Sequence, residues 1–163
     1  MRTVTIVVCQ FDELNEDAQE KAIEWVKNNI HDLHAWHDEA QQSLEAFCDK
    51  FGVMLQNYRV SPCGRIDYKT DADNSHFRGV RLSHINREEM LTGYCLDCDL
   101  MHAFYDKFKS TGDALRAFNH ALNAGFDAWR SDWEDAYSDE SIADFLRSNE
   151  YEFTEAGDKW DGE

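Results

Sequence analysis

The sequence predicts an α+β fold in which a small, mainly antiparallel sheet packs against several helices. The first observation is a stripe of large apolar residues, three or four positions apart, along residues 113–137. This spacing places them on one face of a long amphipathic helix near the C-terminus. The second is a set of segments that read as strands, since residues 3–11 alternate and are rich in β-branched side chains, and residues 53–60 and 65–69 flank a turn. Because 163 residues is the size of one domain, we expect residues 1–163 to form a single acidic α+β domain.

The first third of the chain predicts one strand followed by two helices. Residues 3–11 alternate and are rich in β-branched side chains. Asn15 then suits the N-cap of a short helix, because its side chain can accept a hydrogen bond from a backbone N–H of the first turn. Apolar residues at helical spacing between 31 and 51 predict a second helix, and Gly52 stands where a glycine that ends a helix is expected.

The middle of the chain predicts an antiparallel hairpin. Residues 53–60 and 65–69 are expected to be its two strands, joined by a turn through Pro62 and Gly64. Residues 76–82 follow a polar loop, and we expect them to form a third strand or an irregular sheet edge.

The last part of the chain predicts three helices and a closing strand. Residues 95–109 have helical spacing, and Thr111 can cap the long helix of residues 113–137. Ser138 can cap a shorter helix, and residues 151–154 alternate again. The stripe of the long helix that should be buried comprises Leu115, Phe118, Leu122, Phe126, Trp129, Trp133 and Tyr137.

Acidic residues dominate the charged composition, with 33 Asp and Glu against 16 Lys and Arg, and the formal net charge is −17. The charge is uneven, since residues 1–50 carry −7 and residues 126–163 carry −10, around a nearly neutral middle. Such a field repels nucleic acid and anionic membranes and attracts basic surfaces. We therefore expect no direct binding to nucleic acid, no membrane association, and a partner with a basic surface.

The sequence also bounds the location and the chemistry. No window approaches the ~20 apolar residues of a membrane span, and residues 1–10 lack the long apolar segment of a signal peptide. Five cysteines without the spacing of a small secreted domain fit a reducing compartment, so we expect a cytoplasmic protein. Because the G-x-S-x-G, Walker, H-E-x-x-H and G-x-G-x-x-G motifs are all missing, we expect neither an enzyme nor a cofactor.

Cys95, Cys98 and His102 support an alternative interpretation, because they are spaced to share one face of a helix. Thiolate and imidazole groups at such spacing can share a zinc ion, and Cys63 or His76 could complete the set. A structural zinc site normally has two paired half-sites, however, and the second pair is missing here. We therefore favour no metal and keep a small metal-binding or regulatory interaction module as the alternative.

The acidic residues near the C-terminus suggest a more specific function. Carboxylates three or four residues apart on a helix are ~5–6 Å apart, a spacing comparable with that of backbone phosphates. A protein that binds DNA through Lys and Arg could accept such a row in place of DNA, whereas evenly spread acidity would serve solubility alone. The predicted partner-binding surface, here called the C-terminal carboxylates, comprises Asp127, Asp132, Glu134, Asp135, Asp139, Glu140 and Asp144.

The opening FDELNEDAQEKAIEW and the closing YEFTEAGDKW resemble the two ends of a group of small acidic proteins encoded by tailed phages and prophages. Members typically have a strand, a helix start of the form FDELS-x-x-A-x-x-KA, a second helix with a tryptophan, a central strand region and an ending similar to YEFTEDG. The resemblance implies a phage origin and an accessory role, such as anti-CRISPR or anti-restriction activity. We therefore expect a DNA mimic that acts in the host cytoplasm and blocks the nucleic-acid-binding surface of a host defence complex, such as a CRISPR effector or a restriction enzyme.

Overall fold

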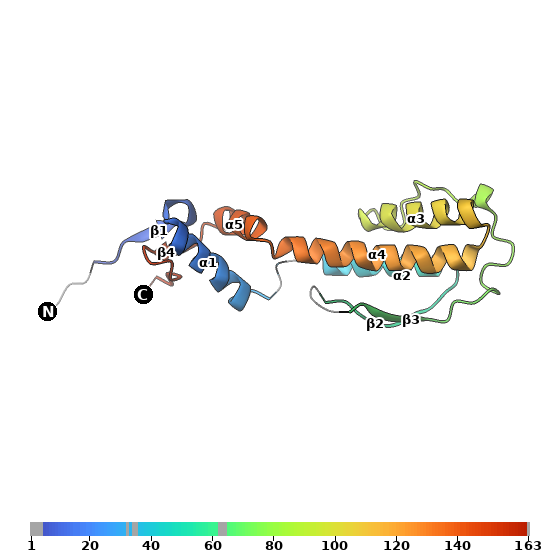
Figure 1. Cartoon of the computed structure of the whole chain (residues 1–163), viewed down its shortest axis with the longest axis horizontal. Helices are drawn as coiled ribbons and strands as arrows, with labels where there is room; N and C mark the ends of the chain where they lie inside the picture. The colour runs from blue at the N-terminus through green and yellow to red at the C-terminus, as the bar shows by residue number, and fades with distance from the viewer. Residues whose placement is uncertain (1–4, 32, 34–35, 62–64, 163) are drawn as a thin grey trace. The chain divides into compact units, whose positions relative to one another are not determined.

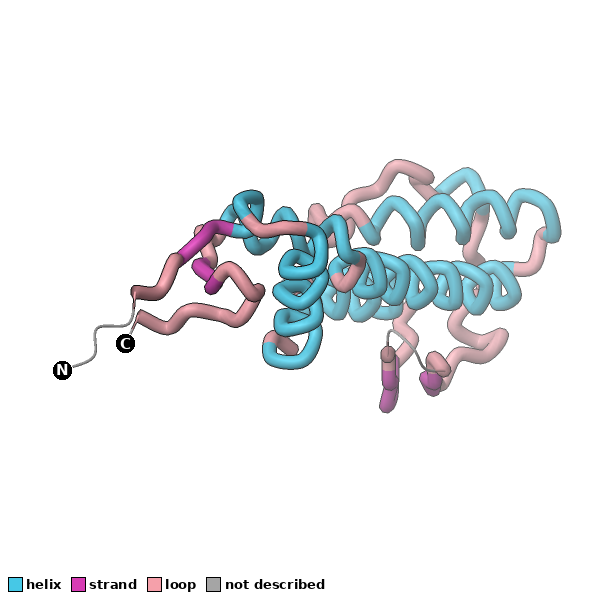
Figure 2. Tube along the Cα trace, turned by 60° about the vertical axis from the view of Figure 1, so that its left-hand side comes forward, coloured by secondary structure: helices cyan, strands magenta, loops and turns pink. Residues whose placement is uncertain are grey.

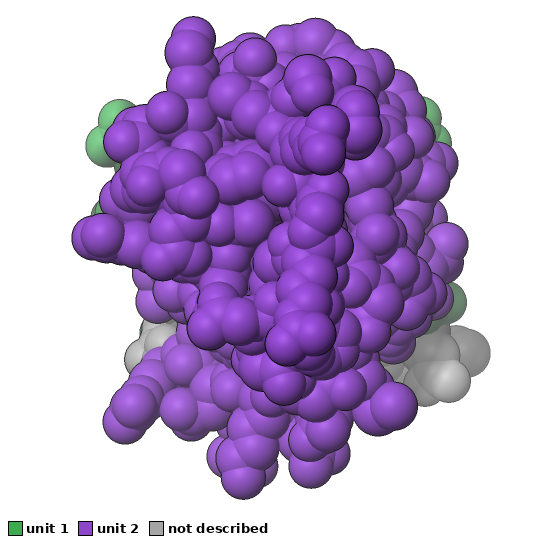
Figure 3. Space-filling model, turned by 90° about the vertical axis from the view of Figure 1, so that its right-hand side faces the viewer, with its two compact units in different colours: residues 1–34, 135–163 green, residues 35–134 purple. Residues whose placement is uncertain are grey.

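The chain falls into two compact units, which are coloured separately in Figure 3. Unit 1 comprises residues 1–34 and 135–163, and unit 2 comprises residues 35–134. The computed structural model describes residues 5–31, 33, 36–61 and 65–162. Helices dominate and the strands are short (Figure 2), which confirms the predicted α+β class. That residues 1–163 act as a single domain stays a prediction.

Two segments from opposite ends of the chain pair as strands in unit 1. β1 (Val8–Gln10) is antiparallel to β4 (Glu152–Thr154), with Cys9 opposite Phe153 (Figure 1). β1 continues directly into the 3-10 helix η1 (Phe11–Glu13). The opening and closing segments of the sequence, residues 11–25 and 151–160, therefore belong to the same unit.

Two helices complete unit 1, and each begins at the predicted cap. α1 (Glu16–Asn29) starts after Asn15, whose Oδ1 accepts a backbone hydrogen bond from the first turn at 3.0 Å. α5 (Asp139–Ser148) starts after Ser138, whose Oγ accepts a similar bond at 3.3 Å. The buried core of unit 1 comprises Phe11, Leu14, Ala18, Ala22, Val26, Ile142, Ala143, Leu146 and Phe153.

The turn that follows β4 lies directly against α1 at Gly157. Its φ of +81° is in the left-handed region, and an added Cβ would lie 2.5 Å from the backbone oxygen of Ala18. Because that oxygen belongs to a helix, it cannot move aside as a flexible side chain would. Glycine is therefore required here both for its backbone conformation and for the close approach.

We expect Gly157→Ala to destabilise the protein by about 1–3 kcal/mol more than Gly162→Ala, the usual cost of overpacking. Gly162 also has a positive φ, +75°, but a Cβ added there would meet no described atom within 4 Å. Both variants carry backbone strain, so their difference measures the collision with α1. Denaturant unfolding of the two variants tests this, and an equal loss of stability in both would contradict the close approach.

Unit 2 consists of helices covered by a hairpin. α2 (His37–Lys50), α3 (Leu96–Thr111) and α4 (Ala114–Ala136) pack together, although the last two residues of α4 belong to unit 1. β2 (Leu55–Arg59) and β3 (Asp67–Thr70) form the antiparallel hairpin. Figure 1 shows the hairpin and α3 on opposite sides of α4.

The central part of the predicted stripe faces the core of unit 2, whereas Leu115 and Trp133 are only partly buried and Tyr137 follows the end of α4, in unit 1. Phe118 and Leu122 are fully buried, and Trp129 is 6% exposed. The ring of Phe126 is also fully buried and stacks on Tyr68 of the hairpin, with 4.8 Å between the ring centroids. The hairpin is therefore held to the helices by aromatic contacts of its inward-facing residues.

The N-cap of α4 is Asp113 and not Thr111, so that prediction is wrong by two residues. Asp113 Oδ1 accepts a hydrogen bond from the backbone N–H of Arg116 at 2.9 Å. Thr111 is the last residue of α3, and its hydroxyl donates to the Lys107 carbonyl at 2.8 Å. The same hydroxyl accepts a hydrogen bond from the Asp113 N–H at 3.2 Å, so Thr111 connects the end of α3 to the residue that caps α4.

Residues 76–82 do not form a third strand. They pass through turns into the 3-10 helix η2 (Leu82–His84). Phe77 is buried and packs against Phe51 and Phe118, with centroid distances of 5.5 and 5.3 Å. The φ of Gly79, +80°, is outside the strand region, so the chain turns at the position where a strand was one of the two expectations.

Several boundaries also differ from those predicted. The second helix begins at His37 rather than at residue 31, while Gly52, with φ +67°, follows its end as expected. The described strands form two separate two-stranded sheets instead of one. The predicted turn through Pro62 and Gly64 lies outside the described residues. Over the part of the chain that the structure describes, no helix has both the length and the apolar character needed to cross a bilayer.

Candidate functional site

The C-terminal carboxylates divide between the two units, so the structure gives them as two sets. All seven side chains belong to exposed residues. The unit 2 set lies on α4 and comprises Asp127, Asp132 and Glu134. The unit 1 set lies on the end of α4 and on α5, and comprises Asp135, Asp139, Glu140 and Asp144.

The unit 2 set is partly neutralised by Arg130. Its guanidinium lies 2.9 Å from Asp127 Oδ1 and 3.8 Å from Glu134 Oε1. Asp132 makes no ion pair with any described residue, and its charge acts on Asp99 instead. Burial first, and then the charge of Asp132, raise the pKa of Asp99 above its usual value. The outer edge of α4 is therefore less anionic than its composition indicates.

The unit 1 set is also partly paired. Lys27 Nζ lies 2.5 Å from Asp139 Oδ1, and the guanidinium of Arg147 lies 2.8 Å from both Asp144 and Asp12. Exposed ion pairs of this kind contribute about 0–1 kcal/mol. A basic partner can therefore take over these carboxylates at little cost in stability.

The sequence prediction missed a second row of carboxylates, on α1. Glu16, Glu20 and Glu24 recur every four residues, are exposed, and make no ion pair with a described residue. We call them the α1 carboxylate row. The neighbouring lysines of α1 bind elsewhere, since Lys21 pairs with Asp158 at 2.6 Å and Lys27 pairs with Asp139. The spacing of four can be seen in the sequence. A count of net charge does not single it out, however, because Lys21 and Lys27 offset part of the negative charge of the same segment.

The α1 carboxylate row is held at a small energetic cost. Like charges four residues apart on a helix repel each other by roughly 0.2–0.5 kcal/mol per pair. Lys21 and Lys27 each lie three residues from Glu24 but pair with Asp158 and Asp139, and Glu16 lies in the first turn of α1, where the helix dipole favours a negative charge. The repulsion along the row is therefore only partly relieved within the described part of the chain.

The net charge of the protein is concentrated in unit 1. Of the 33 acidic residues, 17 belong to unit 1, together with five of the 16 basic residues, which gives −12. Unit 2 is the larger unit, yet its 16 acidic and 11 basic residues give −5. The electrostatic attraction of a basic partner is therefore expected to be strongest toward unit 1.

The proposed zinc ligands Cys95, Cys98 and His102 are not assembled into a metal centre. α3 begins at Leu96, so Cys95 lies at its N-cap and is exposed. His102 Nε2 lies 2.9 Å from Glu88 Oε2, which places the imidazole in an ion-pair geometry. Throughout the described ranges, no three His, Cys, Asp or Glu side chains are grouped so that they could hold a metal ion.

His76, one of the two candidates for the remaining zinc ligand, does not join that set. His76 contacts carboxylates near the hairpin, with its Nδ1 3.2 Å from Asp73 Oδ1 and its Nε2 4.0 Å from Asp71 Oδ1. Cys63 lies outside the described residues.

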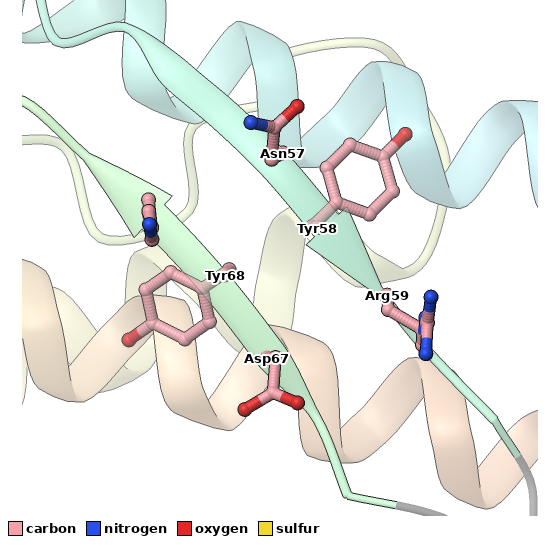
Figure 4. Close-up of a pocket in the computed structure, with 6 residues that line it drawn as sticks. Asn57, Tyr58, Arg59, Asp67 and Tyr68 are labelled. Atoms are coloured by element: carbon pink, nitrogen blue, oxygen red, sulfur yellow. The ribbon is translucent and has the colours of Figure 1, made fainter.

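A hollow of about 420 Å³ lies on the β2–β3 hairpin (Figure 4). Tyr58 and Tyr68 line it, and both rings also contact Phe126, with centroid distances of 5.8 and 4.8 Å. The tyrosines therefore belong to the core as much as to the hollow. The other lining residues are Asn57, Arg59, Asp67 and Lys69. Their mixed charge does not extend the acidic surface.

Comparisons with protein-family models, with curated proteins and with solved structures found no match to this chain.

Proposed function

We propose that this protein is a non-enzymatic inhibitor that binds the basic, nucleic-acid-binding surface of a host defence complex in place of DNA. The observation that supports this most is the charge of unit 1, −12, together with the exposed α1 carboxylate row. The resemblance to phage proteins, whose two segments belong to unit 1, supports a CRISPR effector or a restriction enzyme as the target. The C-terminal carboxylates of unit 1, which are Asp135, Asp139, Glu140 and Asp144, extend the same acidic surface in this proposal.

The physical basis of the proposed binding is electrostatic. A surface that binds duplex DNA carries Lys and Arg at positions that match phosphates, and it holds counterions when no DNA is bound. Carboxylates in a row can displace those counterions and at the same time relieve their own repulsion. Binding should therefore be competitive with duplex DNA and should weaken steeply as the salt concentration rises.

Neutralising the α1 carboxylate row is expected to weaken capture of the partner by at least about tenfold, because three charge-assisted contacts are lost together. The variant carries Glu16→Gln, Glu20→Gln and Glu24→Gln, which keep the shape of the side chains. The tagged protein is used to capture partners from host lysate at low salt, and the amount retained is compared with wild type. Added duplex DNA should release the captured partner.

The matched control neutralises three exposed carboxylates on α4, through Asp127→Asn, Asp132→Asn and Glu134→Gln. It changes the net charge by the same amount but acts on unit 2, where Arg130 already compensates two of the three charges. We expect the amount of partner captured by the control to fall by less than about threefold relative to wild type. An equal loss in both variants would mean that net charge alone attracts the partner, and retention of the partner in excess duplex DNA would exclude mimicry.

A further inference from the structure

A hollow of about 270 Å³ on unit 2 is basic, unlike most of the protein surface. Its lining includes Lys50, Arg78, Arg81 and His84, and none of the described lining residues is acidic. The chain as a whole has 33 acidic residues and 16 Lys and Arg, so a hollow lined by cations without a carboxylate differs from the average surface. The hollow is formed where the loop that contains η2 passes the C-terminal end of α2.

The two arginines of the hollow are not compensated by carboxylates of the described residues. Lys50, by contrast, is compensated by Glu89, because its Nζ lies 2.7 and 2.8 Å from the two carboxylate oxygens of that residue. Arg78 and Arg81 are exposed and make no ion pair with a described residue. Arg87, in the same loop region, shows the usual alternative, because it is bonded to carboxylates within 3.2 Å. Two such guanidinium groups at one hollow are suited to an anionic ligand.

The segment that carries the two arginines is anchored to the core of unit 2. Phe77, which precedes Arg78, is 8% exposed and packs against Phe51 and Phe118. The Val80 N–H donates to the Phe77 carbonyl at 3.2 Å, and the His84 N–H donates to the Arg81 carbonyl at 2.9 Å. The backbone that positions the cations is therefore ordered before any ligand arrives, which lowers the entropic cost of binding.

We propose that this hollow binds an organic phosphate monoester. The planar guanidinium groups of Arg78 and Arg81 match the oxygens of a phosphate and can each donate two parallel hydrogen bonds. His84 can donate a further bond whether its imidazole is neutral or charged. Val80 and Ile85 line the same hollow and provide apolar surface for the organic part of the ligand. The proposal is independent of the acidic surface, so either can fail without the other.

Phenyl phosphate is the probe, and binding is followed through the backbone amide signals of the full chain in NMR spectra. We expect saturable shifts concentrated at residues 78–85, and binding weaker by at least about tenfold in the Arg78→Gln, Arg81→Gln double variant. The control is Arg59→Gln with Lys69→Gln, which removes the same charge from two cations that line the hairpin hollow. The control should change the affinity by less than about twofold. Thermal midpoints of both variants verify that folding is intact.

Further arms distinguish the chemistry and the source of the ligand. Phenol should not bind, because it lacks the phosphate. A short phosphotyrosine peptide that binds more tightly than phenyl phosphate would identify a modified partner, and equal binding would identify a free small molecule. The proposal is overturned if the amide shifts do not saturate or are spread over basic residues generally. It is also overturned if phenol binds as well as phenyl phosphate, or if the control variant loses as much affinity for phenyl phosphate as the double variant does.

Discussion

Replacing Asp97 by Ala is expected to destabilise the protein by about 3–5 kcal/mol, because it leaves several buried donors without an acceptor. Asp97 is fully buried, and its Oδ2 accepts hydrogen bonds from the backbone N–H groups of Leu91, Thr92 and Gly93 at 2.7–2.9 Å. The Thr92 hydroxyl lies 3.2 Å from Oδ1 and 2.9 Å from the hydroxyl of Ser43 on α2. One carboxylate therefore fixes the loop before α3 and connects it to α2.

The pKa of Asp97 makes this stabilisation dependent on pH. Burial alone would raise the pKa, but the N–H groups of Thr92 and Gly93, the Ser43 hydroxyl and the Leu91 N–H outweigh it and hold the pKa below the usual 3.8. A carboxylate with a lowered folded pKa stabilises the protein above its unfolded pKa and loses that contribution as the pH falls through the folded value. The difference in stability between wild type and Asp97→Asn should therefore shrink in acid.

Asp99, two residues further along α3, is the matched control for Asp97. Burial and the charge of Asp132 raise its pKa, so its ionised form is disfavoured in the folded state and its replacement by Ala should cost little or even stabilise the protein near neutral pH. Urea unfolding of both variants from neutral to acid pH measures the contrast. If Asp97→Ala lowered the free energy of unfolding no more than Asp99→Ala does, the buried hydrogen bonds of Asp97 would not be holding the loop.

Phe126→Ala is expected to cost about 3–5 kcal/mol, the range for deleting a buried aromatic side chain. Phe126 is fully buried, and its ring contacts Tyr58, Tyr68 and Trp129 at centroid distances of 5.8, 4.8 and 6.4 Å. Deleting the ring removes contacts on both sides of the boundary between α4 and the hairpin. Among the described strands the hairpin has no other sheet partner, so it cannot close the cavity without leaving its own position.

Leu115→Ala provides the comparison for Phe126, because Leu115 is on the same stripe of α4 but only partly buried. We expect a smaller loss there, about 1–2 kcal/mol. Thermal unfolding followed by tryptophan fluorescence and by far-UV circular dichroism measures both variants. Similar losses at the two positions would mean that burial along α4 does not follow the predicted stripe.

The local patterns of the sequence predicted most helices and their caps, because these depend on residues close in the chain. Asn15 and Ser138 cap their helices as expected, and the α4 stripe is buried from Phe118 to Trp129 but only partly buried at both of its ends. The pairing of Cys9 with Phe153 could not be predicted in this way, since no local pattern specifies which distant strand is the partner. The same limit applies to residues 76–82. Phe77 is buried against the helices, and the chain around it forms turns instead of a strand.

The sign of the surface charge could be predicted from the sequence, but the ion pairs that compensate part of it could not. Charge counts correctly indicate that the carboxylates outnumber the cations toward both ends of the chain. They do not show that Arg130 compensates Asp127 and Glu134, or that Lys27 pairs with Asp139 and not with the α1 carboxylate row. Ion pairs between distant residues depend on the fold, so the sequence alone could not show which carboxylates are paired.

The division into two units also gives a test of the expectation that residues 1–163 behave as one domain. Gly157 belongs to unit 1 and Phe126 to unit 2. If the chain unfolds as one cooperative domain, both substitutions should shift a single common transition. Separate transitions, each sensitive to only one of the substitutions, would identify two independently folding units.

The pairing of β1 with β4 determines when the acidic unit can form during synthesis. Unit 2 is continuous in the chain, so all of its residues leave the ribosome before the segment that completes unit 1. The N-terminal segment of unit 1 must wait, because Phe11 and Val26 share their core with Ile142 and Phe153. A nascent chain that stops after α4 would therefore display a folded unit 2 beside an incomplete acidic unit. In the proposed inhibitor, binding activity would then appear only after the final strand has been translated.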